Sequence, residues 1–289
     1  MEPLVSTRWL ADALGSPDLA VLDASAHLPG AERDARAEFA EAHIPGGQFF
    51  DLKSLTNPDS DVPSALPTRI QLEDRLGALG VASSDRIVLY DNSALRSSAR
   101  AWFMFDLYGW KNVALLDGGL QKWIAEKRPV ESGAETAEAR NQTVPVQPSV
   151  IVMGDNEGRV RCKAEMLANI DANAEQVVDA RDAARFRGDA PDIRSGVAAG
   201  HIPGSCNLPF GIVLNEDGTF KGDADIRAAF ADAGVDLDQP IVTTCGSGIT
   251  ASVLLFALHL IGKSGALYDG SWSEWGSDPS LPVATGEPA

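Results

Sequence analysis

The sequence has few cysteines, no long apolar run and a shortage of positive charge. Its 289 residues include three cysteines, whose odd number and wide spacing exclude a disulfide framework and a paired Cys-x-x-Cys zinc site. Lys and Arg total 24 against 41 Asp and Glu, so the formal net charge is -17. This balance argues against nucleic acid or an anionic membrane surface as a partner. No window approaches the roughly 18 apolar residues of a membrane-spanning helix. We therefore expect a soluble protein with reduced thiols.

The N-terminal segment has no basic stretch followed by an apolar run, and Asp12 and Asp18 argue against an organelle transit peptide. We expect a cytoplasmic protein on these grounds. Hydrophobic residues at 44% and charged residues at 22% are close to the average for globular chains. The length predicts two domains or one large domain.

The chain contains an internal repeat, in which four blocks recur in the same order and at nearly constant spacing. Such order across four blocks is rare by chance and indicates two copies of one domain. The pairs are Val21-Leu22-Asp23-Ala24 with Val177-Val178-Asp179-Ala180, His43-Ile44-Pro45-Gly46 with His201-Ile202-Pro203-Gly204, Asp85-Arg86-Ile87-Val88 with Gln239-Pro240-Ile241-Val242, and Asp117-Gly118-Gly119 with Asp269-Gly270-Ser271.

The repeat predicts an N-terminal domain at 1–130 and a C-terminal domain at 150–289, separated by an exposed linker at 131–149. Short apolar runs alternate with amphipathic stretches in each copy, which is typical of an α/β fold with a parallel sheet and helices on both faces. In such a fold, ligands bind beyond the carboxyl ends of the strands. The predicted strands are 21–22, 87–89, 113–116, 177–178, 241–242 and 266–267, and the predicted helices are 70–79, 99–108, 225–233 and 250–260.

Features shared by the two copies are attributed to the fold, whereas features of one copy point to function. His43 and His201 both precede Ile-Pro-Gly, so we interpret them as structural residues that bind nearby backbone groups. The third strand of the first copy ends in Asp91, whereas that of the second ends in Cys245. The first copy is therefore predicted to be inactive.

Cys245 is the candidate nucleophile of the chain. It follows a strand and begins the loop Cys245-Gly246-Ser247-Gly248-Ile249-Thr250, which leads into a helix. Backbone N–H groups and the helix N-terminus converge at such a point and favour the thiolate over the thiol. A buried, inert cysteine is the alternative interpretation for this residue type. Cys162 and Cys206 have no comparable loop and are interpreted as structural thiols.

Two arginines of the second copy, Arg185 and Arg194, precede its His-Ile-Pro-Gly block. Arginines near the cysteine loop would stabilise a thiolate and hold a carboxylate through bidentate hydrogen bonds. Surface ion pairs with nearby aspartates are the alternative interpretation.

These motifs resemble the two-domain rhodanese-type sulfurtransferases over essentially the whole chain: a tandem domain, His-Ile-Pro-Gly in each half, a cysteine in the second half alone, and Asp269-Gly270-Ser271-Trp272 near the end. The loop is similar to the Cys-Gly-Ser-Gly-Val-Thr-Ala form of the branch that uses 3-mercaptopyruvate. Thiosulfate-using members carry Arg-Lys after the cysteine instead. A dianionic thiosulfate benefits from a lysine in the loop, whereas a keto acid can be held by arginines elsewhere.

The resemblance implies tandem rhodanese-like domains and a double-displacement sulfur transfer through a Cys245 persulfide, with release of pyruvate. It implies substrate-binding roles for Arg185, Arg194, Gly246, Gly248, Ile249 and Thr250, and a catalytic role for Ser247. Related enzymes often carry His-Met-Leu-Pro in the first domain, where this chain has Ser64-Ala65-Leu66-Pro67. The histidine of a Ser-His-Asp relay is therefore absent, and Ser247 alone would polarise the substrate.

The resemblance further implies a sulfur donor, 3-mercaptopyruvate or thiosulfate, and an acceptor such as thioredoxin, a small thiol or cyanide. No metal or organic cofactor is expected. Three alternatives remain: a thiosulfate sulfurtransferase, a phosphatase of the same fold, and a non-enzymatic binding module. The phosphatase would need a longer loop ending in arginine, where this chain has Ala251.

Overall fold

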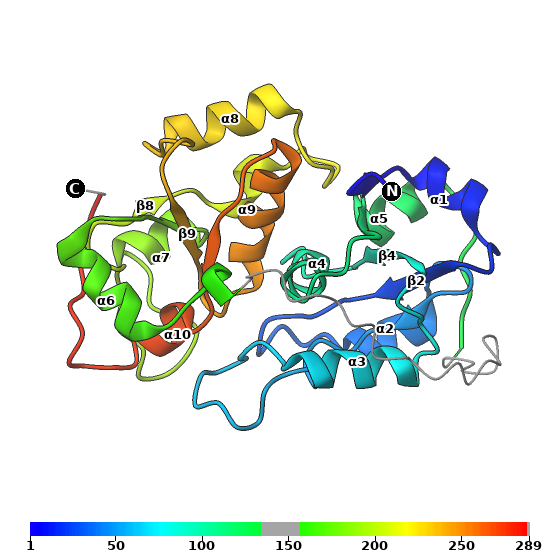
Figure 1. Cartoon of the computed structure of the whole chain (residues 1–289), viewed down its shortest axis with the longest axis horizontal. Helices are drawn as coiled ribbons and strands as arrows, with labels where there is room; N and C mark the ends of the chain where they lie inside the picture. The colour runs from blue at the N-terminus through cyan, green and yellow to red at the C-terminus, as the bar shows by residue number, and fades with distance from the viewer. Residues whose placement is uncertain (134–156, 288–289) are drawn as a thin grey trace. The chain divides into compact units, whose positions relative to one another are not determined.

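The computed structural model describes residues 1–133 and 157–287, which form two compact units (Figure 1). The described part of the first unit is 1–57, 66–133 and 216–219, and that of the second is 58–65, 157–215 and 220–287. Almost all of the predicted linker at 131–149 lies outside the described residues. The domain limits at 130 and 150 therefore stay a prediction.

The first unit is built on a five-stranded parallel sheet with the order β1-β5-β4-β2-β3. Its central strands are runs of apolar residues buried on both faces, the pattern expected where helices cover a parallel sheet. In chain order the strands are β1 (Leu4–Val5), β2 (Leu19–Asp23), β3 (Gln48–Phe49), β4 (Arg86–Tyr90) and β5 (Val113–Leu116).

The second unit repeats this topology with a five-stranded parallel sheet of order β6-β10-β9-β7-β8. The sequence repeat therefore corresponds to a repeat of strand order. The strands are β6 (Val160–Arg161), β7 (Gln176–Asp179), β8 (Cys206–Asn207), β9 (Ile241–Thr244) and β10 (Ala266–Tyr268).

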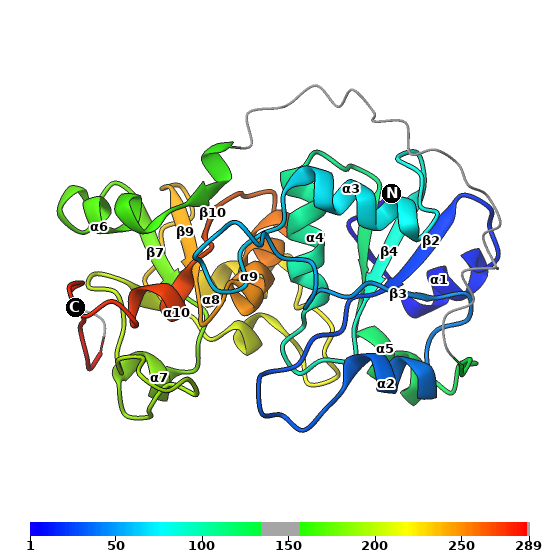
Figure 2. The same ribbon diagram turned by 90° about the horizontal axis from the view of Figure 1, so that it is seen from below.

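Helices cover both faces of the first sheet. In Figure 2, α3 and α4 lie on one side of the sheet and α1, α2 and α5 on the other. Thr68 begins α3 with a reciprocal capping box, in which its hydroxyl accepts from Gln71 N and the Gln71 side chain accepts from Thr68 N. The helices are α1 (Thr7–Ala13), α2 (Ala35–Glu41), α3 (Arg69–Ala78), α4 (Ser98–Leu107) and α5 (Gly119–Ala125).

In the second unit, α9 packs against β9 and β10, and α8 packs against α9. Met166 of α6 and Trp272 and Trp275 of α10 belong to one buried cluster with Val242 of β9. The helices are α6 (Lys163–Ala172), α7 (Ala183–Arg187), α8 (Asp223–Asp232), α9 (Ile249–Leu260) and α10 (Ser271–Trp275), and a short 3-10 turn, η3, spans Phe210–Val213.

All six predicted strands and four predicted helices are present, with ends that differ by at most two residues. The edge strands β1, β3, β6 and β8 were not predicted. Each is two residues long, which is too short for an apolar pattern to identify a strand.

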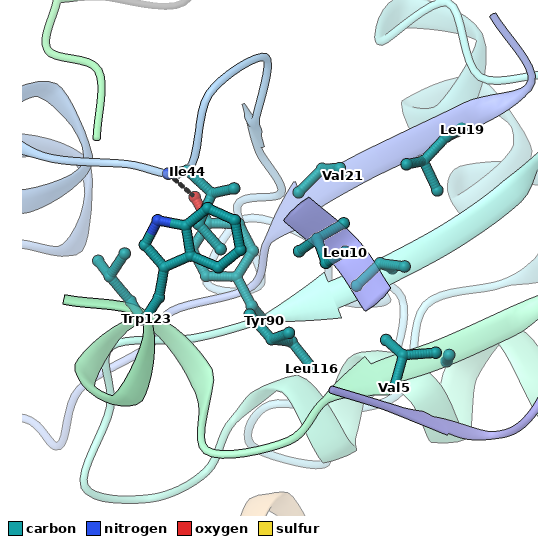
Figure 3. Close-up of a cluster of buried hydrophobic side chains, with 11 residues drawn as sticks. Val5, Leu10, Leu19, Val21, Ile44, Tyr90, Leu116 and Trp123 are labelled. Carbon is teal, nitrogen blue, oxygen red and sulfur yellow. Dashed lines mark hydrogen bonds between the residues drawn. The ribbon is translucent and has the colours of Figure 1, made fainter. Parts of the chain in front are cut away.

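One buried cluster of the first unit packs side chains of α1 and α5 against the strands of the sheet (Figure 3). Trp123 and Tyr90 are fully buried there, and the Tyr90 hydroxyl accepts a 3.4 Å hydrogen bond from Ile44 N. Among the described residues, no helix has the length and apolar character needed to cross a bilayer.

Candidate active site

Cys245 lies at the carboxyl end of β9, where the chain turns into α9. The residue is buried, with 2% of its surface exposed. Gly248 directly before the helix has a φ of 78°, a left-handed conformation that glycine adopts without strain. The loop therefore joins the strand to the helix within residues 245–248. Cys245 lies close to the N-terminal end of α9 as a result.

The start of α10 fixes the back of this loop. The Ser271 hydroxyl accepts from Cys245 N at 3.3 Å and donates to Tyr268 O at 2.9 Å. Trp272 N donates to Cys245 O at 2.9 Å, and Ser273 N donates to Gly246 O at 2.9 Å. The backbone N–H and C=O of Cys245 and the C=O of Gly246 therefore all have hydrogen-bond partners in α10.

The first turn of α9 supplies N–H groups that have no partner within the helix, as at any helix start. Ile249 and Thr250 are the first residues of this turn, Ile249 half-buried and Thr250 buried. With the dipole of a helix that continues to Leu260, these groups favour negative charge next to Cys245.

The equivalent loop of the first unit shows what this position accommodates. Asp91 occupies the place of Cys245 and is 2% exposed. Its two carboxylate oxygens accept from Ser93 N and Ser98 N, each at 2.9 Å, and Ser98 begins α4. A negatively charged group is thus held by loop and helix amides at the corresponding strand end.

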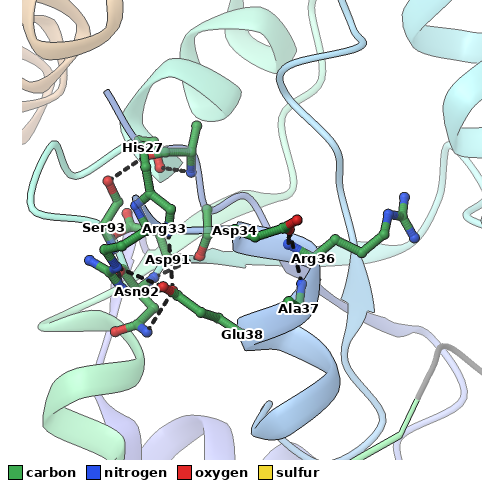
Figure 4. Close-up of polar contacts among 12 residues, drawn as sticks. His27, Arg33, Asp34, Arg36, Ala37, Glu38, Asp91, Asn92 and Ser93 are labelled. Atoms are coloured by element: carbon green, nitrogen blue, oxygen red, sulfur yellow. Dashed lines mark hydrogen bonds and ion pairs between the residues drawn. The ribbon is translucent and has the colours of Figure 1, made fainter. Parts of the chain in front are cut away.

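Side chains of the first unit also cover that loop (Figure 4). Glu38 accepts from Arg33 Nε at 2.6 Å and lies 3.1 Å from His27 Nε2. Its contact with Arg33 lowers the pKa of the Glu38 carboxyl. Arg33 also donates to Asn92 O at 3.0 Å. In the first copy, side chains of the same copy therefore occupy the surroundings of this loop.

An arginine lies beside the Cys245 loop. A methyl group placed on Gly246 would lie 3.4 Å from Nη1 and 3.7 Å from Nη2 of Arg194. The Arg194 guanidinium therefore lies against the loop backbone. Its side chain is 25% exposed, so an anion from solvent can reach it.

The second predicted arginine has a different environment. Arg185 belongs to α7, and its Nε donates to Asp182 Oδ2 at 2.5 Å. Asp182 is the N-cap of the same helix and also accepts from Arg185 N at 3.0 Å. The structure thus brings Arg194 to the loop and gives Arg185 a local carboxylate partner. An incoming anion would have to compete with Asp182 for the Arg185 guanidinium.

Ser271, which the sequence motifs did not single out, also belongs to the surroundings of Cys245. Ser271 is fully buried and has a φ of 49°, which is uncommon for a residue other than glycine. The first copy has Gly119 at this position, with a φ of 60° and with no room for a side chain beside Asp91 O. The sequence signal for this role was that the second copy has Ser271 where the first copy has Gly119. Ser247 is half-buried within the loop.

The two histidines of the repeated motif have equivalent structural contacts. His43 stacks on Phe39, with 4.1 Å between the ring centroids, and its Nδ1 lies 2.8 Å from Phe39 O. His201 stacks on Phe186 at 3.7 Å, and its Nδ1 lies 2.8 Å from Phe186 O. The structural interpretation of both residues agrees with these contacts.

Two aspartates at the ends of β2 and β7 differ in their partners. Asp179 and Arg181 form a buried ion pair with a shortest distance of 2.6 Å. Asp23 has Ser25 in place of that arginine, and Ser25 N donates to its Oδ1 at 2.9 Å. Burial without a cation raises the pKa of Asp23 from 3.8 to about 6.

Asp23→Asn is expected to alter the pH dependence of stability. The native state holds the Asp23 proton more tightly than the unfolded chain, so the stabilisation is greatest below about pH 4 and is lost as the pH rises to about 6. A rise of this size in the pKa of Asp23 corresponds to about 3 kcal/mol in the free energy of unfolding. We therefore expect the variant to gain roughly this much relative to the parent between about pH 4 and pH 7, measured by denaturant unfolding.

Asp12→Asn is the control for this measurement, because that side chain is 77% exposed. An equal effect of Asp23→Asn at both pH values would contradict the assignment to Asp23.

The described residues contain no group of three or more His, Cys, Asp or Glu side chains that could hold a metal ion. The chemistry available at the Cys245 loop is that of the cysteine itself, with amides and an arginine to stabilise negative charge. These features define a class: α/β enzymes that transfer a group through a cysteine nucleophile.

Comparison with known proteins identifies the family within this class. Residues 6–126 and 163–278 match the rhodanese-like domain. The chain is 42% identical to 3-mercaptopyruvate sulfurtransferase of Mus musculus, with 94% of this chain and 91% of that protein covered. It is 39% identical to thiosulfate sulfurtransferase of Rattus norvegicus over the same shares.

Among solved structures, the crystal structure of SseA from Escherichia coli, described with the 3-mercaptopyruvate sulfotransferases, superposes with a TM-score of 0.78. Its sequence identity to this chain is 33%, over 95% of this chain and 100% of that structure. The chain therefore belongs to the rhodanese family and is a sulfurtransferase.

Proposed function

We propose that the protein transfers sulfur from 3-mercaptopyruvate, through a persulfide on Cys245, to a thiol or cyanide acceptor, with release of pyruvate. The observation that carries the proposal is the Arg194 guanidinium against Gly246, beside an otherwise uncharged loop. A cation beside the loop suits a donor whose carboxylate lies to one side of the reacting sulfur.

In the first half-reaction, the Cys245 thiolate attacks the sulfur of 3-mercaptopyruvate and forms an S–S bond. The C–S bond of the donor breaks, and its electron pair passes to carbon and forms the enolate of pyruvate. The proton that the donor thiol loses balances the proton that this enolate takes up. Arg194 stabilises the developing enolate charge, with Arg185 and Ser247 as further donors to the substrate.

The persulfide that remains is an anion at the position where the first copy holds the Asp91 carboxylate. The amides of Gly246, Gly248, Ile249 and Thr250 are proposed to stabilise it in the same manner. In the second half-reaction, an acceptor thiolate or cyanide attacks the outer sulfur and the S–S bond breaks. Thioredoxin and small thiols are the proposed acceptors, and cyanide would give thiocyanate.

The three cysteines of the chain are unpaired: Cys162 is exposed, Cys206 is half-buried and Cys245 is buried. Burial raises the pKa of the Cys206 thiol, which lowers its reactivity. We propose a reducing compartment, the cytoplasm, for the protein, because unpaired thiols such as that of the exposed Cys162 persist there.

Thiosulfate is the second candidate donor, since a thiosulfate sulfurtransferase is 39% identical to the chain. Pyruvate release from 3-mercaptopyruvate and sulfite release from thiosulfate, measured with one acceptor, separate the two. We expect kcat/KM for 3-mercaptopyruvate to be at least about tenfold higher, because Arg194 recognises a carboxylate and the loop carries no cation for a dianion.

Ser247→Lys tests this reasoning, because it adds a cation within the loop and leaves Arg194 in place. Since it also removes the Ser247 hydroxyl, the decisive readout is kcat/KM for thiosulfate itself, which should rise in this variant. A parent enzyme that prefers thiosulfate would overturn the proposed donor and leave the persulfide mechanism intact. Absence of turnover with both donors would overturn the proposed function.

A further inference from the structure

Asp192 lies two residues before Arg194 and has unusual surroundings for an aspartate in a loop. Its side chain is 1% exposed. Oδ1 accepts two hydrogen bonds from Arg194, from the backbone N at 2.9 Å and from Nη1 at 3.3 Å. Oδ2 is buried and, within the described residues, has no hydrogen-bond partner.

A buried carboxylate oxygen without a partner is unfavourable, so a structural role alone would be better served by a neutral side chain. The neighbouring ion pairs differ from this one. Arg185 and Arg187 each donate Nε to an aspartate, Asp182 or Asp189, whose side chain is more than half exposed. Asp192 instead contacts a terminal nitrogen of Arg194 from a buried position.

This contact determines where the guanidinium lies. Nη1 is held by Asp192 Oδ1, and the same nitrogen is the one nearest the methyl position on Gly246. Within the described residues, Nη1 is the only guanidinium nitrogen of Arg194 that makes a hydrogen bond. The remaining N–H groups of the guanidinium can therefore bind an anion.

We propose that Asp192 is a positioning residue that holds the Arg194 guanidinium over the Cys245 loop for recognition of an anionic donor. This inference rests on the proposed function and deepens it, because it names the group that orients the donor-binding arginine. Asp192 itself carries negative charge and repels an anion. By positioning Arg194, Asp192 favours anion binding, whereas its own charge disfavours anion binding.

The two effects can be separated by alkylation of Cys245, which needs no sulfur donor. Iodoacetate carries a carboxylate, whereas iodoacetamide is its neutral analogue of similar size. The ratio of their rate constants at Cys245, followed by mass spectrometry of the peptide that contains this residue, cancels the thiolate fraction and its nucleophilicity. The ratio therefore reports attraction of the reagent's carboxylate.

Asp192→Ser removes the contact with the guanidinium but retains an oxygen that can accept from Arg194 N. We expect the ratio to fall at least about threefold in Asp192→Ser and in Arg194→Gln, and to fall no further in the double variant. Asp189→Ser, the same substitution of an exposed aspartate in the same segment, should leave the ratio within about 1.5-fold of the parent.

An unchanged or increased ratio in Asp192→Ser would overturn the proposal, and so would independent, multiplicative effects in the double variant. Thermal unfolding and the iodoacetamide rate verify that the variants are folded. If Asp192→Ser is unfolded, Asp192→Asn keeps the volume and the turn and should still lower the ratio at least about 1.5-fold. Failure of 3-mercaptopyruvate as a donor would leave the alkylation result valid, so the two proposals fail separately.

Discussion

Replacing Cys245 with serine is expected to lower kcat/KM for sulfur transfer from 3-mercaptopyruvate by at least about a thousandfold. A serine hydroxyl is not ionised near neutral pH and cannot carry the transferred sulfur as a persulfide. Pyruvate release measures the loss of turnover. Mass spectrometry after exposure to the donor without acceptor measures the second consequence, which is that the variant gains no sulfur atom.

Cys162→Ser and Cys206→Ser are the matched controls, since they make the same substitution at the other two cysteines of the chain. Both should retain turnover within about twofold of the parent and should still gain one sulfur at Cys245. Retention of substantial turnover by Cys245→Ser would contradict the assignment of the nucleophile.

Arg181→Met is expected to lower the free energy of unfolding of the second unit by about 3–5 kcal/mol. Arg181 and Asp179 are both nearly fully buried, and Arg181 binds both carboxylate oxygens and donates to Gly200 O at 2.8 Å. Removing the cation leaves a buried carboxylate without compensation. The guanidinium also lies 4.5 Å from the ring of Trp272, whose backbone N–H binds Cys245 O, so the Cys245 loop should loosen as well.

Denaturant unfolding at neutral pH, followed by tryptophan fluorescence, measures this effect. The double variant Asp179→Asn/Arg181→Met should recover most of the lost stability, because it removes the uncompensated charge. Arg187→Met is the control, since that arginine is on the surface with 33% of its side chain exposed. A loss below about 1 kcal/mol in Arg181→Met would show that Asp179 is accommodated without its partner.

The two copies together explain why these predictions differ. Asp23 and Asp179 occupy the same place in the repeat, but only Asp179 has an arginine two residues later. Asp23 accordingly has a raised pKa, whereas Asp179 is held in an ion pair. The first copy therefore serves as a natural reference for what removal of Arg181 does to the second.

Much of the fold could be predicted from the sequence because the repeat doubles the signal. The central strands are apolar runs with recognisable counterparts in the other half, and parallel α/β domains of this kind follow from that alternation. Positions of the two-residue edge strands could not be predicted, because their pairing is decided by neighbours such as Leu115 and Leu267 rather than by local pattern.

The sequence by itself determined the duplication, the α/β class, and the exchange of Asp91 for Cys245 that separates the two copies. These features depend on residue identity and order along the chain. Only the tertiary structure decided that Arg194 lies against Gly246 and that Ser271 accepts the amide of Cys245. The physical reason is that these contacts join residues from separate loops and helices, and their distances depend on how the strands and helices pack.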